Sequence, residues 1–213
     1  IIAVEWWKKS AEQGNAIAQF YLGRCFGEGI GVELNELDEA EWYTKAAIQG
    51  HKEAQFNLAD MYFHGRGVLE DKTLAFFWYK SAAEQGMAEA QFNLAVMYDD
   101  GDGVDEDKEQ AIELYMNAAK QGMAEAQYHL GYCYIYGDGV EENDEKAFEW
   151  YTKAAIQGYI NAQYALGLCY EGGIGTDKNH IKAIEWYTKA AEQGHEDSID
   201  ALDMLNYSIN EKK

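Results

Sequence analysis

The sequence predicts an all-α fold, an α-solenoid built as a right-handed superhelix of 36-residue helix-turn-helix repeats. Its 213 residues include no proline, the residue that a helix interior tolerates least. Apolar residues make up 47% of the chain and aromatic residues 14%, which excludes a disordered segment. A Gln-Gly pair also recurs every 36 residues, and a fixed period of this length is typical of repeat architectures. The glycines of this pair are Gly14, Gly50, Gly86, Gly122, Gly158 and Gly194.

Each repeat is predicted to hold two helices joined by a glycine-rich turn. The first helix is seen in residues 90–98, where apolar positions recur at the spacing of one helical face. A turn such as residues 65–68, Gly-Arg-Gly-Val, follows, because glycine adopts positive φ without steric cost. The second helix carries aromatic and alanine residues on one stripe, which we expect to be buried, and its closing Gln-Gly predicts a left-handed cap. In the fourth repeat this stripe is Ala147, Trp150, Tyr151, Ala154 and Ala155.

The period divides the chain into a single array over residues 1–213, with five full units and a half unit at each end. We expect a half repeat at 1–14, full repeats at 15–50, 51–86, 87–122, 123–158 and 159–194, and a C-terminal capping helix at 195–213. One helix pair cannot bury its own apolar face, whereas stacked pairs can. About twelve helices follow from this division.

The repeated words resemble a known family. The pattern Ala-Gln-x-x-Leu-Gly-x-x-Tyr, then Gly-x-Gly-Val, then Ala-x-x-Trp-Tyr-x-Lys-Ala-Ala-x-Gln-Gly is similar to the Sel-1-like repeat, a relative of the tetratricopeptide repeat. Departures are small, such as Glu39 where the other repeats have alanine and Leu114 where they have tryptophan. The resemblance implies adaptor or scaffold proteins, with bacterial members often tied to signalling or host contact. It names no ligand.

Composition limits the partners and the compartment. The formal charge of −21 disfavours nucleic acid and anionic lipid as partners. The sequence contains no run of 18 apolar residues, so we expect no insertion into a membrane. The excess of acidic residues favours a basic protein partner, or it serves only to keep the protein soluble. We expect a monomer. The first residues lack the features of a signal peptide and there is no initiator methionine, so we expect a piece of a longer protein. The compartment stays open, with the cysteine usage favouring the cytoplasm.

No residues predict catalysis, a cofactor or a metal. Cys25, Cys133 and Cys169 share one repeat position with methionines, which indicates a soft core site rather than a disulfide framework. The acidic turns at 99–107 and 172–177 resemble calcium loops only in part, and we interpret them as solvated turns. A hydrolase acting on cell-wall or β-lactam substrates is the alternative from another class. The Ser-x-x-Lys, Ser-Asp-Asn and Lys-Thr-Gly motifs of such enzymes are missing.

The candidate binding residues lie on the first helices. The position two before the core leucine lies about 160° from it around the helix, where a surface helix ordinarily has charge. This chain has aromatic side chains there, and asparagine or histidine beside several of them. In helical-repeat solenoids the first helices line the concave surface, so we expect a groove. Its predicted residues are Phe20, Tyr21, Phe56, Asn57, Phe92, Asn93, Tyr128, His129, Tyr132 and Tyr164.

These observations favour a non-catalytic adaptor that binds a peptide or a partner's helix in the groove. The asparagines are suited to clamp a peptide backbone, because a side-chain amide both donates and accepts hydrogen bonds. Two alternatives stay open. Each aromatic side chain could pack against the neighbouring repeat instead, and convex carboxylates could dock a basic protein.

Overall fold

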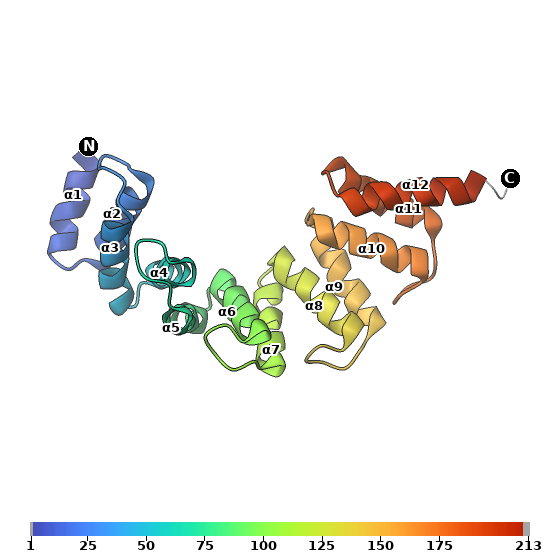
Figure 1. The fold of residues 1–213 in the computed structure, drawn as a ribbon, viewed down its shortest axis with the longest axis horizontal. Coiled ribbons are helices and arrows are strands. Elements are labelled where there is room, and N and C mark those ends of the chain that lie inside the picture. The colour runs from blue at the N-terminus through green and yellow to red at the C-terminus, as the bar shows by residue number, and fades with distance from the viewer. Residues whose placement is uncertain (1, 211–213) are drawn as a thin grey trace. The chain divides into compact units, whose positions relative to one another are not determined.

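The computed structural model describes residues 2–210, and the side chains of residues 4–205. The described residues form twelve helices and no strand, which confirms the all-α solenoid of stacked helix pairs (Figure 1). Residue 1 and residues 211–213 of the predicted terminal half units lie outside the described residues. The helices divide into two compact units, Ile1–Asp107 and Lys108–Lys213.

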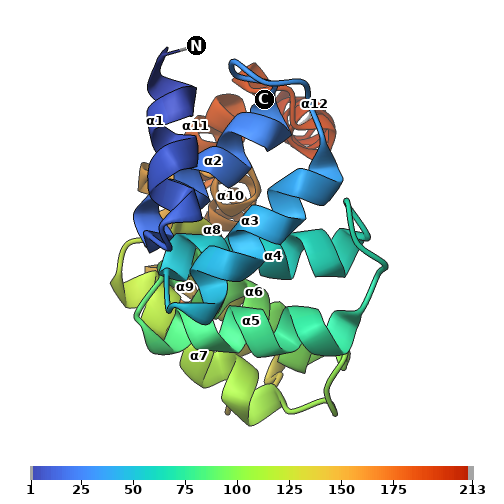
Figure 2. The ribbon, with the colours of Figure 1, turned by 90° about the vertical axis from the view of Figure 1, so that its left-hand side faces the viewer.

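Within each unit, every helix packs against the helices before and after it in the chain. Figure 2 shows the neighbouring pairs of the first unit, in which α2 lies against α3 and α4 against α5. The helices of unit 1 are α1 (Ile2–Glu12), α2 (Ala16–Glu28), α3 (Glu36–Ile48), α4 (Lys52–His64), α5 (Lys72–Glu84) and α6 (Ala88–Asp100). Those of unit 2 are α7 (Lys108–Lys120), α8 (Ala124–Tyr136), α9 (Asp144–Ile156), α10 (Ile160–Gly172), α11 (His180–Glu192) and α12 (Glu196–Asn210).

The core joins the leucine of a first helix to the tyrosine and alanines of the second helix of the preceding repeat. Leu166 of α10 packs in one cluster with Tyr151, Ala154 and Ala155 of α9. The predicted stripe on α9 is buried, except that Trp150 is half-buried and lies under the Lys153 ammonium, 3.8 Å from its ring centroid. Small alanines beside a large ring let two helices approach closely, so the stripe acts as a packing surface.

Glutamine side chains tie each first helix to the preceding repeat and to the end of its own second helix, which explains the two Gln positions of the repeat. Gln55 on α4 donates from its Nε2 to the Ala47 carbonyl oxygen at the end of α3. Its Oε1 accepts from Gln85 Nε2 at the end of α5, 2.7 Å away. This first-helix glutamine is therefore buried with both polar atoms of its amide hydrogen-bonded, as a buried amide requires. The same bond recurs in unit 2 between Gln127 and Gln157.

The glycines of the turns hold positive φ, as the sequence predicts. Gly65 ends α4 in the left-handed region, and Gly86 after α5 has φ +81°. The second glycine of the Gly-x-Gly turn has a further reason to be glycine. A Cβ atom at Gly67 would overlap the Glu36 carbonyl of α3, because this turn packs directly on the preceding repeat.

The three cysteines are buried and free, which confirms that their common position belongs to the core. Burial raises the pKa of the Cys169 thiol to about 12. No helix in the described part of the chain is long and apolar enough to cross a membrane.

Candidate functional site

The aromatic residues predicted on the first helices make one recurring contact. Four of the rings lie against the buried tyrosine of the following helix, with centroids 5.6–5.7 Å apart. The rings are therefore partly buried, and Phe92, only 7% exposed, counts as core. The four measured pairs are Phe20–Tyr43, Phe56–Tyr79, Tyr128–Tyr151 and Tyr164–Tyr187. The fold itself thus uses these positions, a role that the helical-wheel argument does not anticipate.

The two asparagines beside these rings also serve the fold. Asn57 shares a hydrogen bond with the Tyr43 hydroxyl, and Asn93 shares one with the Tyr79 hydroxyl. Burial, the largest cause, raises the pKa of both tyrosines. Each asparagine is half-buried, and one hydrogen bond leaves other donor and acceptor positions of its amide open. Asn57 and Asn93 can therefore support a buried tyrosine and still meet a ligand.

Phe92 and Asn93 come together at a cavity in unit 1. The cavity lies between α4 and α6, has a volume of about 190 Å³, and is lined mostly by apolar surface. Asp60 stands at its edge, paired with Arg66 at 2.7 Å and with His64 at 3.4 Å. Its lining residues are Asp60, Phe63, His64, Tyr79, Phe92, Asn93, Val96 and Met97. The size and lining suit one apolar side chain of a ligand.

The other predicted residues of unit 1 lie elsewhere on the first helices. Phe20 stacks on His51 with centroids 4.6 Å apart, and Tyr21, 38% exposed, stacks on Trp7 at 4.8 Å. Phe56 packs on Tyr79 but does not line the cavity. The structure thus brings two of the six predicted unit 1 residues to the cavity.

In unit 2 the most accessible predicted residue is Tyr132 of α8. It is 46% exposed and forms a tilted pair with the 62% exposed Tyr136, with centroids 4.5 Å apart. His129 stacks on Tyr115 of α7, and Tyr164 stacks on His195. An exposed pair of aromatic rings on a first helix is the kind of surface that is enriched at protein interfaces.

The sequence prediction omits several residues that line the unit 1 cavity. Asp60 and Val96 lie one turn beyond the predicted positions, on the same side of their helices. Tyr79 belongs to the buried stripe of a second helix, so its sequence pattern indicates core alone. Each shares a helical face with the aromatic residue four positions before it, because residues four apart lie on the same side of a helix.

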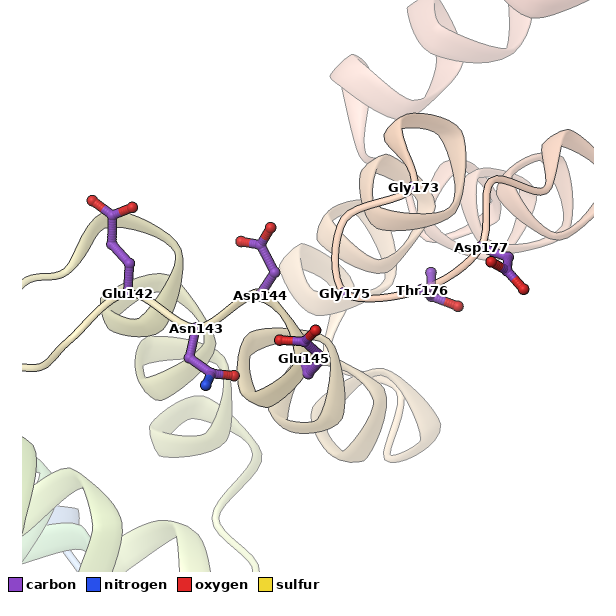
Figure 3. A pocket seen from close by; sticks show the side chains of 8 residues that line it. All are labelled: Glu142, Asn143, Asp144, Glu145, Gly173, Gly175, Thr176 and Asp177. Atoms are coloured by element: carbon purple, nitrogen blue, oxygen red, sulfur yellow. The ribbon is translucent and has the colours of Figure 1, made fainter.

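A polar hollow of unit 2 lies at the turns of its repeats. It has a volume of about 780 Å³ and is lined by the start of α9 and the turn after α10 (Figure 3). Figure 3 shows the carboxylates of Glu142, Asp144, Glu145 and Asp177 around it. Lysine stands at the repeat position of Asp144 in two earlier repeats, where Lys72 pairs with Asp102 at 2.7 Å and Lys108 with Asp138 at 3.6 Å. Asp144 has no cationic partner among the described residues.

In the described part of the chain, no group of three or more histidine, cysteine or acidic side chains is placed to hold a metal ion. This observation includes the two acidic turns that resemble calcium loops in the sequence. The α4–α6 cavity and the polar hollow of unit 2 offer packing, charge and hydrogen bonds for recognising a ligand.

Comparisons with known proteins agree with the repeat architecture. The Sel1 repeat model matches residues 1–15, 16–51, 52–87, 88–123, 124–159 and 160–195. A search of curated proteins finds no match. Proteins built from Sel1 repeats generally mediate protein–protein interactions, and the repeat is generally a non-enzymatic scaffold.

Three solved structures illustrate the likeness. A protective antigen of uropathogenic Escherichia coli strains, which displays an SLR fold, is 38% identical, with a TM-score of 0.91 over 94% of this chain and 43% of that one. The chain thus spans less than half of that protein. A Sel1 repeat protein from Oxalobacter formigenes is 33% identical, with a TM-score of 0.83 over 89% of this chain and 76% of that one. An immunity protein from Pseudomonas aeruginosa is 25% identical, with a TM-score of 0.53 over 86% of this chain and 67% of that one. The chain belongs to the Sel1 repeat family.

Proposed function

We propose that the chain is a non-catalytic interaction module that binds an extended segment of a partner protein on the exposed face of its first helices. The observation that carries this proposal is the cavity between α4 and α6, where apolar walls and the Asn93 amide meet. A partner's apolar side chain fills the cavity, and Asn93 bonds to the neighbouring peptide backbone. Apolar burial supplies affinity while the amide fixes the direction of the segment.

Exposed aromatic residues on other first helices also favour this face as the binding surface. Tyr21 lies on α2, and Tyr132 and Tyr136 lie on α8. Tyrosine brings a large contact area and a polar tip at a low entropy cost, which suits it to interfaces. Within each unit, these rings extend the contact beyond a single cavity.

A peptide library and one substitution test the proposal. Peptides selected from a random display library on the parent protein are titrated by calorimetry against Val96→Asp. The fold accepts aspartate at this register, since Asp60 occupies it in the second repeat. A charge in the cavity should weaken binding about tenfold or more, because burying an unpaired charge costs more than 1.4 kcal/mol.

The matched control is Ile48→Glu. Ile48 is exposed at the end of α3, away from the cavity, and glutamate occupies the same register as Glu84 in the second repeat. We expect full binding by this variant. Equal affinities of Val96→Asp and the parent would refute the α4–α6 cavity as the binding site.

A second candidate function is the docking of a basic protein on the acidic hollow of unit 2. The unpaired Asp144, where two other repeats have lysine, favours it. Binding of this kind should fade as salt rises from about 0.1 to 1 M, because the screening length falls from about 10 to 3 Å. Apolar binding at the α4–α6 cavity should persist over the same range. A triple variant, Glu142→Gln with Glu145→Gln and Asp177→Asn, should abolish the acidic docking alone.

A further inference from the structure

A second cavity, in unit 2, occupies the same repeat register as the α4–α6 cavity but carries different chemistry. It lies between α10 and α12 and has a volume of about 270 Å³. Tyr187 of α11 lines it as Tyr79 of α5 lines the first cavity, three repeats earlier in the chain. The recurrence shows that the spacing of successive first helices leaves a hollow beside the second-helix tyrosine.

The floor of the unit 2 cavity is more apolar than the corresponding part of the first. Leu168 replaces Asp60, and Met204 replaces Val96. Met204 is 72% exposed, and Tyr164 adds an aromatic ring. A long aliphatic or planar side chain can therefore lie along this floor.

The rim of the same cavity carries three carboxylates. Glu171 stands where the first cavity has Phe63, and Asp200 stands where it has Phe92. Asp197, in the first turn of α12, is the third. None of the three pairs with a cation among the side chains that the structure describes, whereas Asp60 at the first cavity is neutralised by Arg66.

One of these carboxylates is already held in place. The Tyr187 hydroxyl donates to Glu171 Oε2 over 2.7 Å, and both residues line the cavity. Burial first, and then the negative charges of Asp197 and Glu171, raises the pKa of the Tyr164 hydroxyl. The acids thus act on the interior of the cavity, and a cation placed there would relieve their mutual repulsion.

We propose that the α10–α12 cavity is a specific acceptor for an arginine side chain of the partner protein. The guanidinium is planar, stacks on aromatic rings and pairs with carboxylates through two parallel bonds. Its aliphatic stem lies on Leu168 and Met204, and its head meets Glu171, Asp197 and Asp200. The compact, strongly hydrated ammonium of lysine matches an aromatic and apolar floor less well.

This inference rests on the proposed function, since the arginine belongs to the segment bound on the first helices. The two cavities then differ in specificity: the α4–α6 cavity accepts an apolar side chain, and the α10–α12 cavity accepts a cation. Specificity at each cavity depends on two or three residues of the repeat register, while the backbone around them stays the same.

The test titrates small probes into protein carrying labelled methionine and alanine methyl groups and follows the Met204 and Ala201 signals by NMR. The probes are N-acetyl-arginine methylamide, its lysine counterpart and its citrulline counterpart, which has nearly the shape of arginine without the charge. We expect saturable shifts with arginine, and binding at least about tenfold weaker with citrulline and measurably weaker with lysine. Equal shifts with arginine and citrulline, or equal affinity for arginine and lysine, would overturn the assignment.

Two variants of α12 localise the effect. Asp197→Asn with Asp200→Asn should remove arginine binding. Glu196→Gln with Asp203→Asn removes the same charge from exposed positions that do not line the cavity and should leave binding intact. Equal losses in both variants would show a diffuse surface field instead of a site. Val96→Asp, which tests the proposed function, should leave arginine binding unchanged, so the two proposals fail separately.

Discussion

Asn93 is expected to have two roles, and a mutant cycle can separate them. Tyr79 is 2% exposed, and its hydroxyl shares a hydrogen bond with the Asn93 side chain. Replacing Asn93 by alanine leaves this buried hydroxyl without that partner. The cost of an unsatisfied buried polar group is about 1–3 kcal/mol, so Asn93→Ala should destabilise the chain by that amount.

The measurement is urea unfolding of four proteins: the parent, Asn93→Ala, Tyr79→Phe and the double variant. Because Tyr79→Phe removes the hydroxyl, adding Asn93→Ala to it should cost little further stability. The cycle should therefore show a coupling energy of about 1 kcal/mol or more between the two positions. Asn117→Ala, at an exposed position on α7, controls for the loss of an asparagine and should change stability by less than about 0.5 kcal/mol.

The same four proteins test the proposed backbone contact. The double variant avoids the orphaned hydroxyl, so any loss of peptide binding in it reports on the ligand and not on the fold. We expect that loss to be about 1–3 kcal/mol, the cost of leaving a partner's donor or acceptor unpaired. A coupling energy near zero would refute the hydrogen-bond reasoning, and unchanged peptide binding would refute the backbone contact of Asn93.

Four further predictions concern the stability and reactivity of the repeats. Burial holds the pKa of Glu39 above its ordinary value, so the folded state favours the neutral acid. Glu39→Gln should therefore be more stable than the parent at pH 7 in urea unfolding. This difference in stability should vanish at pH values below the ordinary pKa of glutamate, where the parent side chain is neutral in both states. Gly86→Ala should cost about 1 kcal/mol in thermal melts through backbone strain alone, whereas Gly67→Ala should cost more, because its Cβ also meets a carbonyl. Cys169, with its thiol pKa raised to about 12, should react with a thiol reagent at pH 8 only as the protein unfolds, as absorbance would record. Deleting residues 50–85 should leave a shorter helical protein by circular dichroism, since contacts within a unit join consecutive helices.

The helices and turns could be predicted because the same pattern of apolar residues and glycines recurs in every repeat. Positive φ at Gly86 follows from its place after a helix, and the buried alanines and Tyr151 follow from one helical stripe. The sequence did not show why the repeat conserves its glutamines and the second glycine of its turn. The Gln55–Gln85 bond joins residues 30 positions apart at the two ends of one repeat, and the need for Gly67 arises from a carbonyl of the preceding repeat. The recurrence of a glutamine or a glycine in the sequence does not identify the distant residue that it contacts.

The candidate site was predicted in part, for a related physical reason. A helical wheel places Phe92 and Asn93 on a face away from the core leucine, but it treats the helix as isolated. In the structure the preceding helix, α5, presents Tyr79 to Asn93, which becomes its hydrogen-bond partner, and Phe92 is buried in the core. Val96 lies one helical turn after Phe92 on the same side of α6, and in the structure it borders the cavity. Packing between helices decides exposure, and a single-helix argument cannot supply it.

The junctions between repeats show how the chain varies chemistry on a constant backbone. At one turn Lys72 pairs with Asp102. At the corresponding turn of unit 2 the position of the lysine is occupied by Asp144, which has no such ion pair in the part of the chain that the structure describes. The turn keeps its shape, because the glycine that contacts the preceding repeat is present in both places as Gly103 and Gly175. Main-chain contacts and buried alanines thus fix the geometry, and the exposed positions are free to change charge. A partner that reads several such positions along one unit would gain specificity without any change in the fold, as additive contacts at a fixed spacing allow.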